Sequence, residues 1–127
     1  LVITFKSAQD LDLYLPASGK TVTARDRQAL DHYAALHGTG YCRTGCGDCV
    51  GACDKNVNIA AIQRYHMYFK DYGDQKRAME SYAALEQSAR PCLDCATPGC
   101  ANACPHGLPI VSQLREAHRN LTLSSMA

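Results

Sequence analysis

Eight cysteines in a chain of 127 residues are the strongest constraint on what this sequence folds into, because they fall into two dense groups of four. The first group has the spacing Cys42-x₃-Cys46-x₂-Cys49-x₃-Cys53. The second has the spacing Cys92-x₂-Cys95-x₄-Cys100-x₃-Cys104 and is followed by Pro105. Three cysteines close together and a fourth three residues on, ahead of proline, are typical of [4Fe–4S] ferredoxin sites. The spacing therefore predicts two four-thiol sites.

The fourth cysteine of each group is expected to belong to the other site. Three thiolates on one tight loop hold three corners of a cubane, and the fourth lies one helical turn further on, pointing toward the neighbouring cluster. One predicted cluster is held by Cys42, Cys46, Cys49 and Cys104. The other is held by Cys92, Cys95, Cys100 and Cys53. Four glycines are expected to let the backbone approach the inorganic sulfides and direct N–H groups at them: Gly45, Gly47, Gly51 and Gly99.

Three other interpretations of the cysteines stay open. Zinc also binds four clustered thiolates, so two Cys₄ sites would use all eight and make the chain a zinc-stapled interaction module. A disulfide framework needs an oxidising compartment. In the third interpretation a single cluster survives, or one site holds a [3Fe–4S] core, because both groups depart from the commonest spacing.

Composition excludes several functional classes. The formal net charge is +1, and the 13 basic and 12 acidic residues are interleaved, so no basic surface for nucleic acid is expected. No apolar run approaches the roughly 20 residues that a membrane helix needs. Lys6 and Asp10 interrupt the apolar stretch in which a signal peptide would lie. A cytoplasmic location is expected, since thiolate ligands persist in reducing compartments.

Helix signals occur along almost the whole chain and predict a mainly α fold. Ser7 and Asp10 form a capping-box pattern, and Thr23 repeats it with Asp26. The helix that follows is expected to reach about Leu36. We expect a helical arm over residues 1–40, an α-helical ferredoxin domain with two cysteine-rich loops over residues 41–120, and a frayed tail over residues 121–127.

Three further helices are expected in the second of these regions. Asn56 or Asn58 caps the first, which carries His66 on its apolar face, where we expect a core histidine. Asp74 begins the second, and Pro109 opens the last. Each cysteine group is followed by a helix, and this internal pseudo-repeat suggests two equivalent sites. Two arginines that flank the groups, Arg43 and Arg90, are candidates for offsetting the charge of a cluster.

Two runs of the sequence resemble a known family. They are YCRTGCGDCVGACDKNVNIAAIQRYHMYFKDYG and ARPCLDCATPGCANACPHGLPIVSQLREAH. Together they resemble the C-terminal double-cluster domain of bacterial aldo/keto reductase-like oxidoreductases, which belongs to the α-helical ferredoxins. Residues 1–40, with VITFKSAQDLDLYL, resemble the helical stretch that leads out of the barrel in those proteins.

The resemblance implies an iron–sulfur electron-transfer module that belongs to, or docks on, a larger oxidoreductase. The catalytic residues of that family lie in its barrel, which takes about 250 residues and does not fit in this chain. We therefore predict no catalytic residue here, and Leu1 in place of Met fits an excised or processed piece. The alternative is the tail of such an enzyme, without chemistry of its own.

The cysteine prediction also changes the expected charge and stability. Eight thiolates around two oxidised cores add roughly −4, so the loaded protein would carry about −3 and its redox partner a basic docking surface. Cluster binding would contribute folding energy, because short helices with narrow apolar faces form only a small core. We expect the metal-free form to be largely unfolded.

Overall fold

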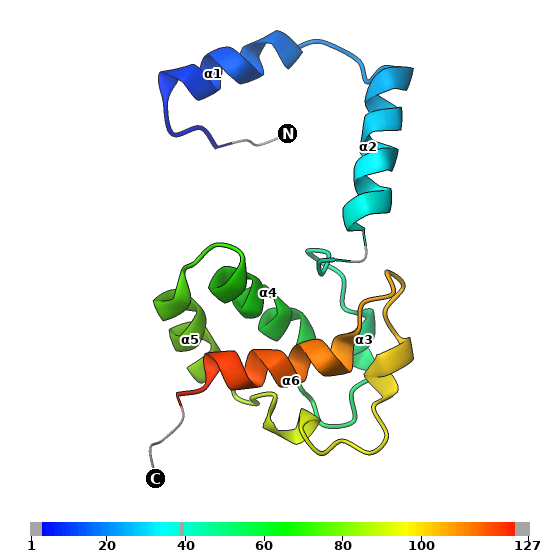
Figure 1. Cartoon of the computed structure of the whole chain (residues 1–127), viewed down its shortest axis with the longest axis vertical. Helices are drawn as coiled ribbons and strands as arrows, with labels where there is room; N and C mark the ends of the chain where they lie inside the picture. Colours follow the sequence, from blue (N-terminus) through cyan, green and yellow to red (C-terminus); the bar gives the residue numbers. More distant parts are fainter. Residues whose placement is uncertain (1–3, 39, 124–127) are drawn as a thin grey trace. The chain divides into compact units, whose positions relative to one another are not determined.

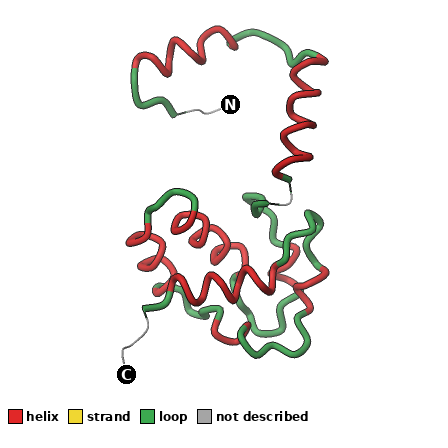
Figure 2. The backbone as a smooth tube through the Cα atoms, in the orientation of Figure 1, coloured by secondary structure: helices red, strands yellow, loops and turns green. Residues whose placement is uncertain are grey.

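The computed structural model describes residues 4–38 and 40–123, and these residues form helices joined by loops, with no strand among them (Figures 1 and 2). The predicted mainly α fold is confirmed at this level. The chain divides into two compact units, Leu1–Leu36 and His37–Ala127. The division falls four residues before the end of the predicted arm.

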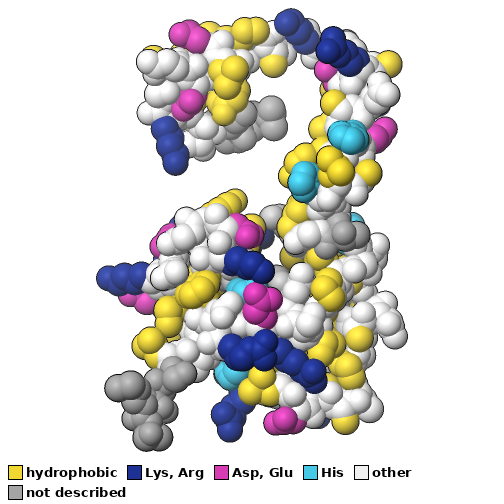
Figure 3. Space-filling model, viewed as in Figure 1, with side chains coloured by type: hydrophobic (Ala, Val, Ile, Leu, Met, Phe, Trp, Pro, Cys, Tyr) yellow, Lys and Arg dark blue, Asp and Glu magenta, His cyan; other side chains and the backbone are white. Residues whose placement is uncertain are grey.

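The first unit contains the helix α1 (Ala8–Tyr14), the 3₁₀ helix η1 (Leu15–Ala17) and most of α2 (Ala24–His37). Both predicted capping boxes are present. The hydroxyl of Ser7 accepts from the backbone N–H of Asp10 at 3.2 Å, and that of Thr23 accepts from the N–H of Asp26 at 3.2 Å. These helices contain no buried residue, and their hydrophobic side chains lie at the surface (Figure 3).

The described residues of the second unit form the four-residue α3 (Asp48–Gly51), three longer helices and two 3₁₀ helices. The longer helices are α4 (Ile59–Lys70), α5 (Gln75–Ala83) and α6 (Ile110–Leu121). The 3₁₀ helices are η2 (Arg90–Cys92) and η3 (Gly99–Asn102). The helix α4 packs on both α5 and α6 (Figure 1), and the buried core lies among them.

Sequence signals account for the bounds of these helices. Asn58 is the N-cap of α4, and its side chain accepts from the N–H of Ala61 at 3.1 Å. Pro109 is the N-cap of α6. Leu121, which the sequence assigns to the tail, is the last residue of α6 and is buried. The rest of the predicted tail, residues 124–127, lies outside the described residues.

Tyr82 ties the helical core to the second cysteine group. Its hydroxyl accepts from the N–H of Ala89 at 2.8 Å and lies 2.7 Å from Nδ1 of His118 on α6. Ala89 is fully buried and directly precedes η2, which ends at Cys92. The hydrogen bond between the buried Tyr82 hydroxyl and the Ala89 N–H therefore holds the backbone in place just before η2 and Cys92. None of the described helices has the length and apolar character that crossing a membrane requires.

Candidate metal centre

The eight cysteines lie on two segments of the second unit, which we call the first cysteine segment (residues 42–53) and the second cysteine segment (residues 92–104). All eight are free thiols. Cys49 in α3, Cys92 at the end of η2 and Cys100 in η3 are buried, and the other five are partly exposed. The short helical turns therefore direct one buried thiol from the first segment and two from the second toward the interior.

Electrostatic interactions among the thiols of the first segment include one thiol from the second. Burial raises the pKa of Cys42, and negative charge on Cys46 and Cys104 raises it further. Burial also raises the pKa of Cys49 to about 11, with contributions from Cys42, Cys104 and Cys46. We call these four thiols set 1: Cys42, Cys46, Cys49 and Cys104.

The remaining thiols interact in the same way. Burial raises the pKa of Cys92 to about 11, and charge on Cys53, Cys100 and Cys95 adds to it. Burial raises the pKa of Cys100 as well, with contributions from Cys53 and Cys95. These four thiols form set 2: Cys53, Cys92, Cys95 and Cys100. The two sets have the same members as the predicted ligand sets, and their binding of a metal stays a prediction.

Set 2 lines a single small cavity. All four of its thiols reach this cavity, together with Pro91, Gly99 and the apolar side chains of Val111 and Leu114 on α6. Within residues 4–38 and 40–123, no three His, Cys, Asp or Glu side chains are close enough to hold a single metal ion.

The donor chemistry of both sets fits a soft metal or a cluster. A thiol whose pKa is raised by burial stays protonated at neutral pH unless a cation compensates its charge, and a coordinating metal removes the proton outright. Four clustered thiolates are typical ligands of Fe–S clusters and of zinc. The type of donor atom in both sets therefore suits either group, while the spacing of the described side chains is too wide for a single ion.

A close backbone contact between the two segments brings their thiols together. A Cβ on Gly99 would lie 2.6 Å from the carbonyl oxygen of Ala52, so only glycine fits at position 99 without displacement of the backbone. Gly99 precedes Cys100 and Ala52 precedes Cys53, which are two members of set 2. Gly47 and Gly51 have open space where a Cβ would be, so the structure gives a steric reason for glycine only at position 99 among these three.

The ends of the two segments and the helices that follow them have similar backbone conformations, at a spacing of 51 residues. We call residues 48–70 the first repeat and residues 99–121 the second repeat. The helices α4 and α6 both have 12 residues and begin at Ile59 and Ile110. Before them, Ala52 has φ −88° and ψ 0°, and its counterpart Ala103 has φ −87° and ψ −6°.

The connection from each fourth cysteine to its helix also repeats. Asn56 and Gly107 both have positive φ, 54° and 68°, in the left-handed region that glycine and asparagine favour. Asn58 has φ −75° and ψ 76°, and Pro109 has φ −77° and ψ 68°, which are inverse γ-turn values. The expected pseudo-repeat of a cysteine loop and a helix is therefore present in the backbone.

Of the two arginines expected near the thiols, Arg43 interacts with a cysteine and Arg90 with a histidine. Arg43 lies beside Cys42 and partly offsets the rise of its pKa by burial, while its guanidinium donates to the carbonyls of Gly38 at 2.9 Å and Tyr41 at 3.2 Å. Arg90 instead interacts with His118 and lowers its pKa, after the larger lowering by burial.

Sequence reasoning missed two arginines, Arg64 on α4 and Arg115 on α6. Burial raises the pKa of Cys42 and of Cys92, and Arg64 and Arg115 respectively offset part of that rise. The signal that identifies them is an arginine 11 residues after the fourth cysteine of each group.

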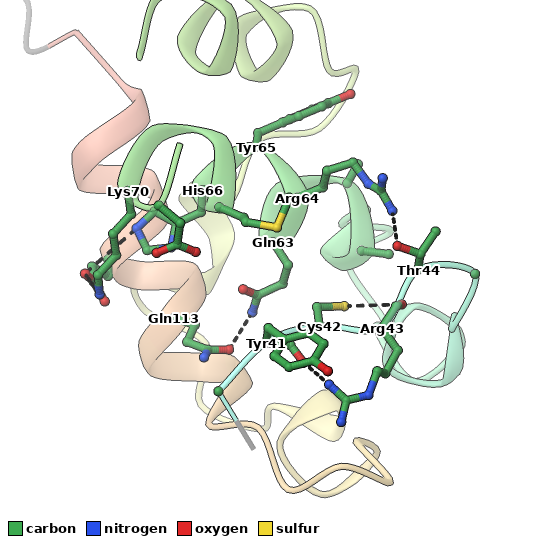
Figure 4. A pocket seen from close by; sticks show the side chains of 17 residues that line it. Tyr41, Cys42, Arg43, Thr44, Gln63, Arg64, Tyr65, His66, Lys70 and Gln113 are labelled. Atoms are coloured by element: carbon green, nitrogen blue, oxygen red, sulfur yellow. Dashed lines mark hydrogen bonds and ion pairs between the residues drawn. The ribbon is translucent and has the colours of Figure 1, made fainter. Parts of the chain in front are cut away.

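A cavity of about 400 Å³ adjoins Cys42 of set 1 (Figure 4). Polar side chains from α4 and α6 border it, and Gln63 donates to the side-chain oxygen of Gln113 at 2.8 Å. His66 also lines it and is buried, with its Nε2 lying 3.2 Å from Nδ2 of Asn120 and 3.8 Å from the Glu116 carboxylate. His66 is thus the core histidine that the helix pattern indicates.

Comparisons with models of protein families, with curated proteins and with solved structures found no match to this chain.

Proposed function

We propose that the unit His37–Ala127 is an α-helical ferredoxin module that holds two [4Fe–4S] clusters and relays single electrons to a redox partner. The observation that carries the proposal is that Cys53, the last cysteine of the first segment, lines one cavity with Cys92, Cys95 and Cys100 of the second. The electrostatic interactions of Cys42 and Cys49 with Cys104 support the reciprocal exchange in set 1. This exchange of the fourth ligand is typical of two-cluster ferredoxins.

Set 1 would hold one cluster and set 2 the other, and the clusters would supply the one-electron chemistry. The chain's own residues ligate and shield them. Cys49, Cys92 and Cys100 are buried, so three ligands are protected from solvent. Val111 and Leu114 cover set 2 with apolar surface. Such burial is one of the means by which a protein sets a reduction potential.

The partner we propose is a redox protein or the remainder of a larger oxidoreductase in a reducing compartment. The loaded protein would carry a charge of about −3, since two oxidised clusters with eight thiolates add roughly −4 to the +1 of the chain. A partner with a basic docking surface complements that charge.

The experiment is anaerobic purification of the protein, followed by measurement of iron, acid-labile sulfide and zinc per chain and EPR of the reduced sample. The proposal predicts about eight iron and eight sulfide per chain, with a brown colour that bleaches on reduction. Two zinc ions in a colourless protein would contradict it and support the zinc-stapled interaction module. About half the expected iron would indicate a single cluster.

A further inference from the structure

Arg64 and Arg115 occupy equivalent positions in the two repeats. Each is the sixth residue of its helix, in α4 and α6 respectively, and each follows the fourth cysteine of its segment by 11 residues. A repeat at a spacing of 51 residues otherwise retains few side chains, so the shared arginine stands out among mostly different neighbours.

Arg64 reaches from α4 to the loop between the first two cysteines of set 1. Its Nη2 donates to the hydroxyl of Thr44 at 3.1 Å, and Thr44 lies between Cys42 and Cys46 (Figure 4). The guanidinium also interacts electrostatically with the Cys42 thiol. Arg64 therefore joins the helix that follows Cys53, a member of set 2, to the loop of set 1.

Arg115 makes the corresponding contact from α6. Its Nε donates to the backbone carbonyl of Cys92 at 3.0 Å in a partly buried position, and the guanidinium interacts electrostatically with the Cys92 thiol. Arg115 therefore joins the helix that follows Cys104, a member of set 1, to the loop of set 2. The two contacts are therefore reciprocal: each arginine lies on the helix that follows a cysteine of one set and binds the loop of the other set.

We propose that Arg64 and Arg115 are paired positioning residues of the two metal centres. Each holds one cysteine loop in place and puts a positive charge near a thiol, Arg64 near Cys42 of set 1 and Arg115 near Cys92 of set 2. This inference rests on the proposed electron-transfer function and assigns its residues a role in setting the two potentials. A centre that gains an electron becomes more negative, so a nearby positive charge stabilises its reduced state.

The test is a potentiometric titration of the loaded protein, followed by EPR, with Arg64→Gln and Arg115→Gln. Each substitution is expected to lower the potential of one couple, and the two are expected to act on different couples. At a fixed potential the reduced fraction of the affected centre should fall several-fold; a tenfold change equals about 59 mV for a one-electron couple.

Conservative and matched variants separate charge from structure. Arg64→Lys and Arg115→Lys keep the positive charge and should retain most of the wild-type potential. Arg119→Gln removes an exposed arginine one turn further along α6 and should leave both couples in place. If Arg115→Gln lowers the iron content, the inference requires that the EPR signal it loses is the one that Cys92→Ser also loses.

Three results would overturn the inference while leaving the proposed function intact, provided that the wild-type protein holds iron and sulfide. The first is that neither glutamine variant changes a reduction potential, and the second is that both variants change the potential of the same couple. The third is that Arg119→Gln changes a potential by as much as Arg64→Gln or Arg115→Gln does. A wild-type protein that holds zinc instead of iron would overturn the proposed function and this inference together.

Discussion

In the first repeat α4 directs Gln63 and His66 into the interior, whereas in the second repeat α6 directs Leu114 and Ala117 inward at the equivalent positions. The backbone path is the same, yet set 1 adjoins a polar cavity and set 2 a small apolar one. Two repeats with similar backbone conformation thus surround the two thiol sets with side chains of different polarity. Polarity, hydrogen bonding and charge around a centre are the means by which a protein tunes it.

Removing the proposed clusters is expected to have the largest effect on the two thiol sets. The buried apolar core lies among α4, α5 and α6, while the buried side chains of the cysteine segments are themselves cysteines. Chelation or acid extraction should therefore abolish the cooperative unfolding transition of the second unit, because the proposed clusters would supply much of its folding energy. Circular dichroism during heating measures this. A cooperative, native-like transition in metal-free protein would contradict the expectation.

Gly99→Ala is expected to have the next largest effect. The added Cβ would lie 2.6 Å from the Ala52 carbonyl oxygen, so the contact between the segments must open. Forced overpacking of this kind destabilises proteins by about 1–3 kcal/mol. Denaturant unfolding of the loaded protein measures the change. The matched control is Gly51→Ala, which meets nothing within 4 Å; equal destabilisation by the two substitutions would show that the contact is not what matters.

The buried histidine of the first repeat predicts a dependence of stability on pH. Burial lowers the pKa of His66 below 6.5, against a smaller opposing effect of Glu116. The unfolded chain therefore binds the proton first, so this contribution to stability is complete above pH 6.5 and is lost as the pH falls through the folded pKa.

Replacing His66 separates this contribution from others. His66→Gln should reduce the loss of stability on acidification, measured as the shift in the denaturant midpoint with pH. His118 keeps a residual dependence, since burial lowers its pKa too. An unchanged pH profile in His66→Gln would exclude His66 as its source.

The smallest expected effect lies outside the repeats. Thr23→Ala removes the hydroxyl that accepts from the N–H of Asp26 and should destabilise α2 by about 1 kcal/mol. Because α2 precedes the cysteine segments, the metal content should be unchanged. Helicity by circular dichroism and iron per chain are the two measurements, and a parallel loss of iron would contradict the separation of the arm from the metal centres.

Local sequence signals were enough to predict most of the helices. The capping residues Ser7, Thr23 and Asn58 act within four residues of the backbone groups they bind, so their role is visible in the sequence. Pro109 likewise directly precedes the last helix as its N-cap. The cysteine spacing gives the same grouping of thiols as their electrostatic interactions in the structure, and the binding of a metal by each group stays a prediction.

What the sequence did not reveal depends on contacts between distant segments. The reason for glycine at position 99 is the carbonyl of Ala52, 47 residues earlier, which no local pattern indicates. Arg64 and Arg115 look like surface residues of amphipathic helices until the fold brings them to Thr44 and Cys92. The register of the repeat was likewise hidden, because few side chains are shared between its halves.

The most direct test of the exchanged ligand sets is the iron content of two double variants measured side by side. Cys42→Ser/Cys104→Ser removes two thiols of set 1 that lie on different segments, and Cys42→Ser/Cys53→Ser removes two thiols of the same segment that belong to different sets. With exchanged fourth ligands, the first variant keeps about four iron atoms per chain and the second loses nearly all of them. The reverse result, with iron retained in Cys42→Ser/Cys53→Ser and lost in Cys42→Ser/Cys104→Ser, would contradict the exchange.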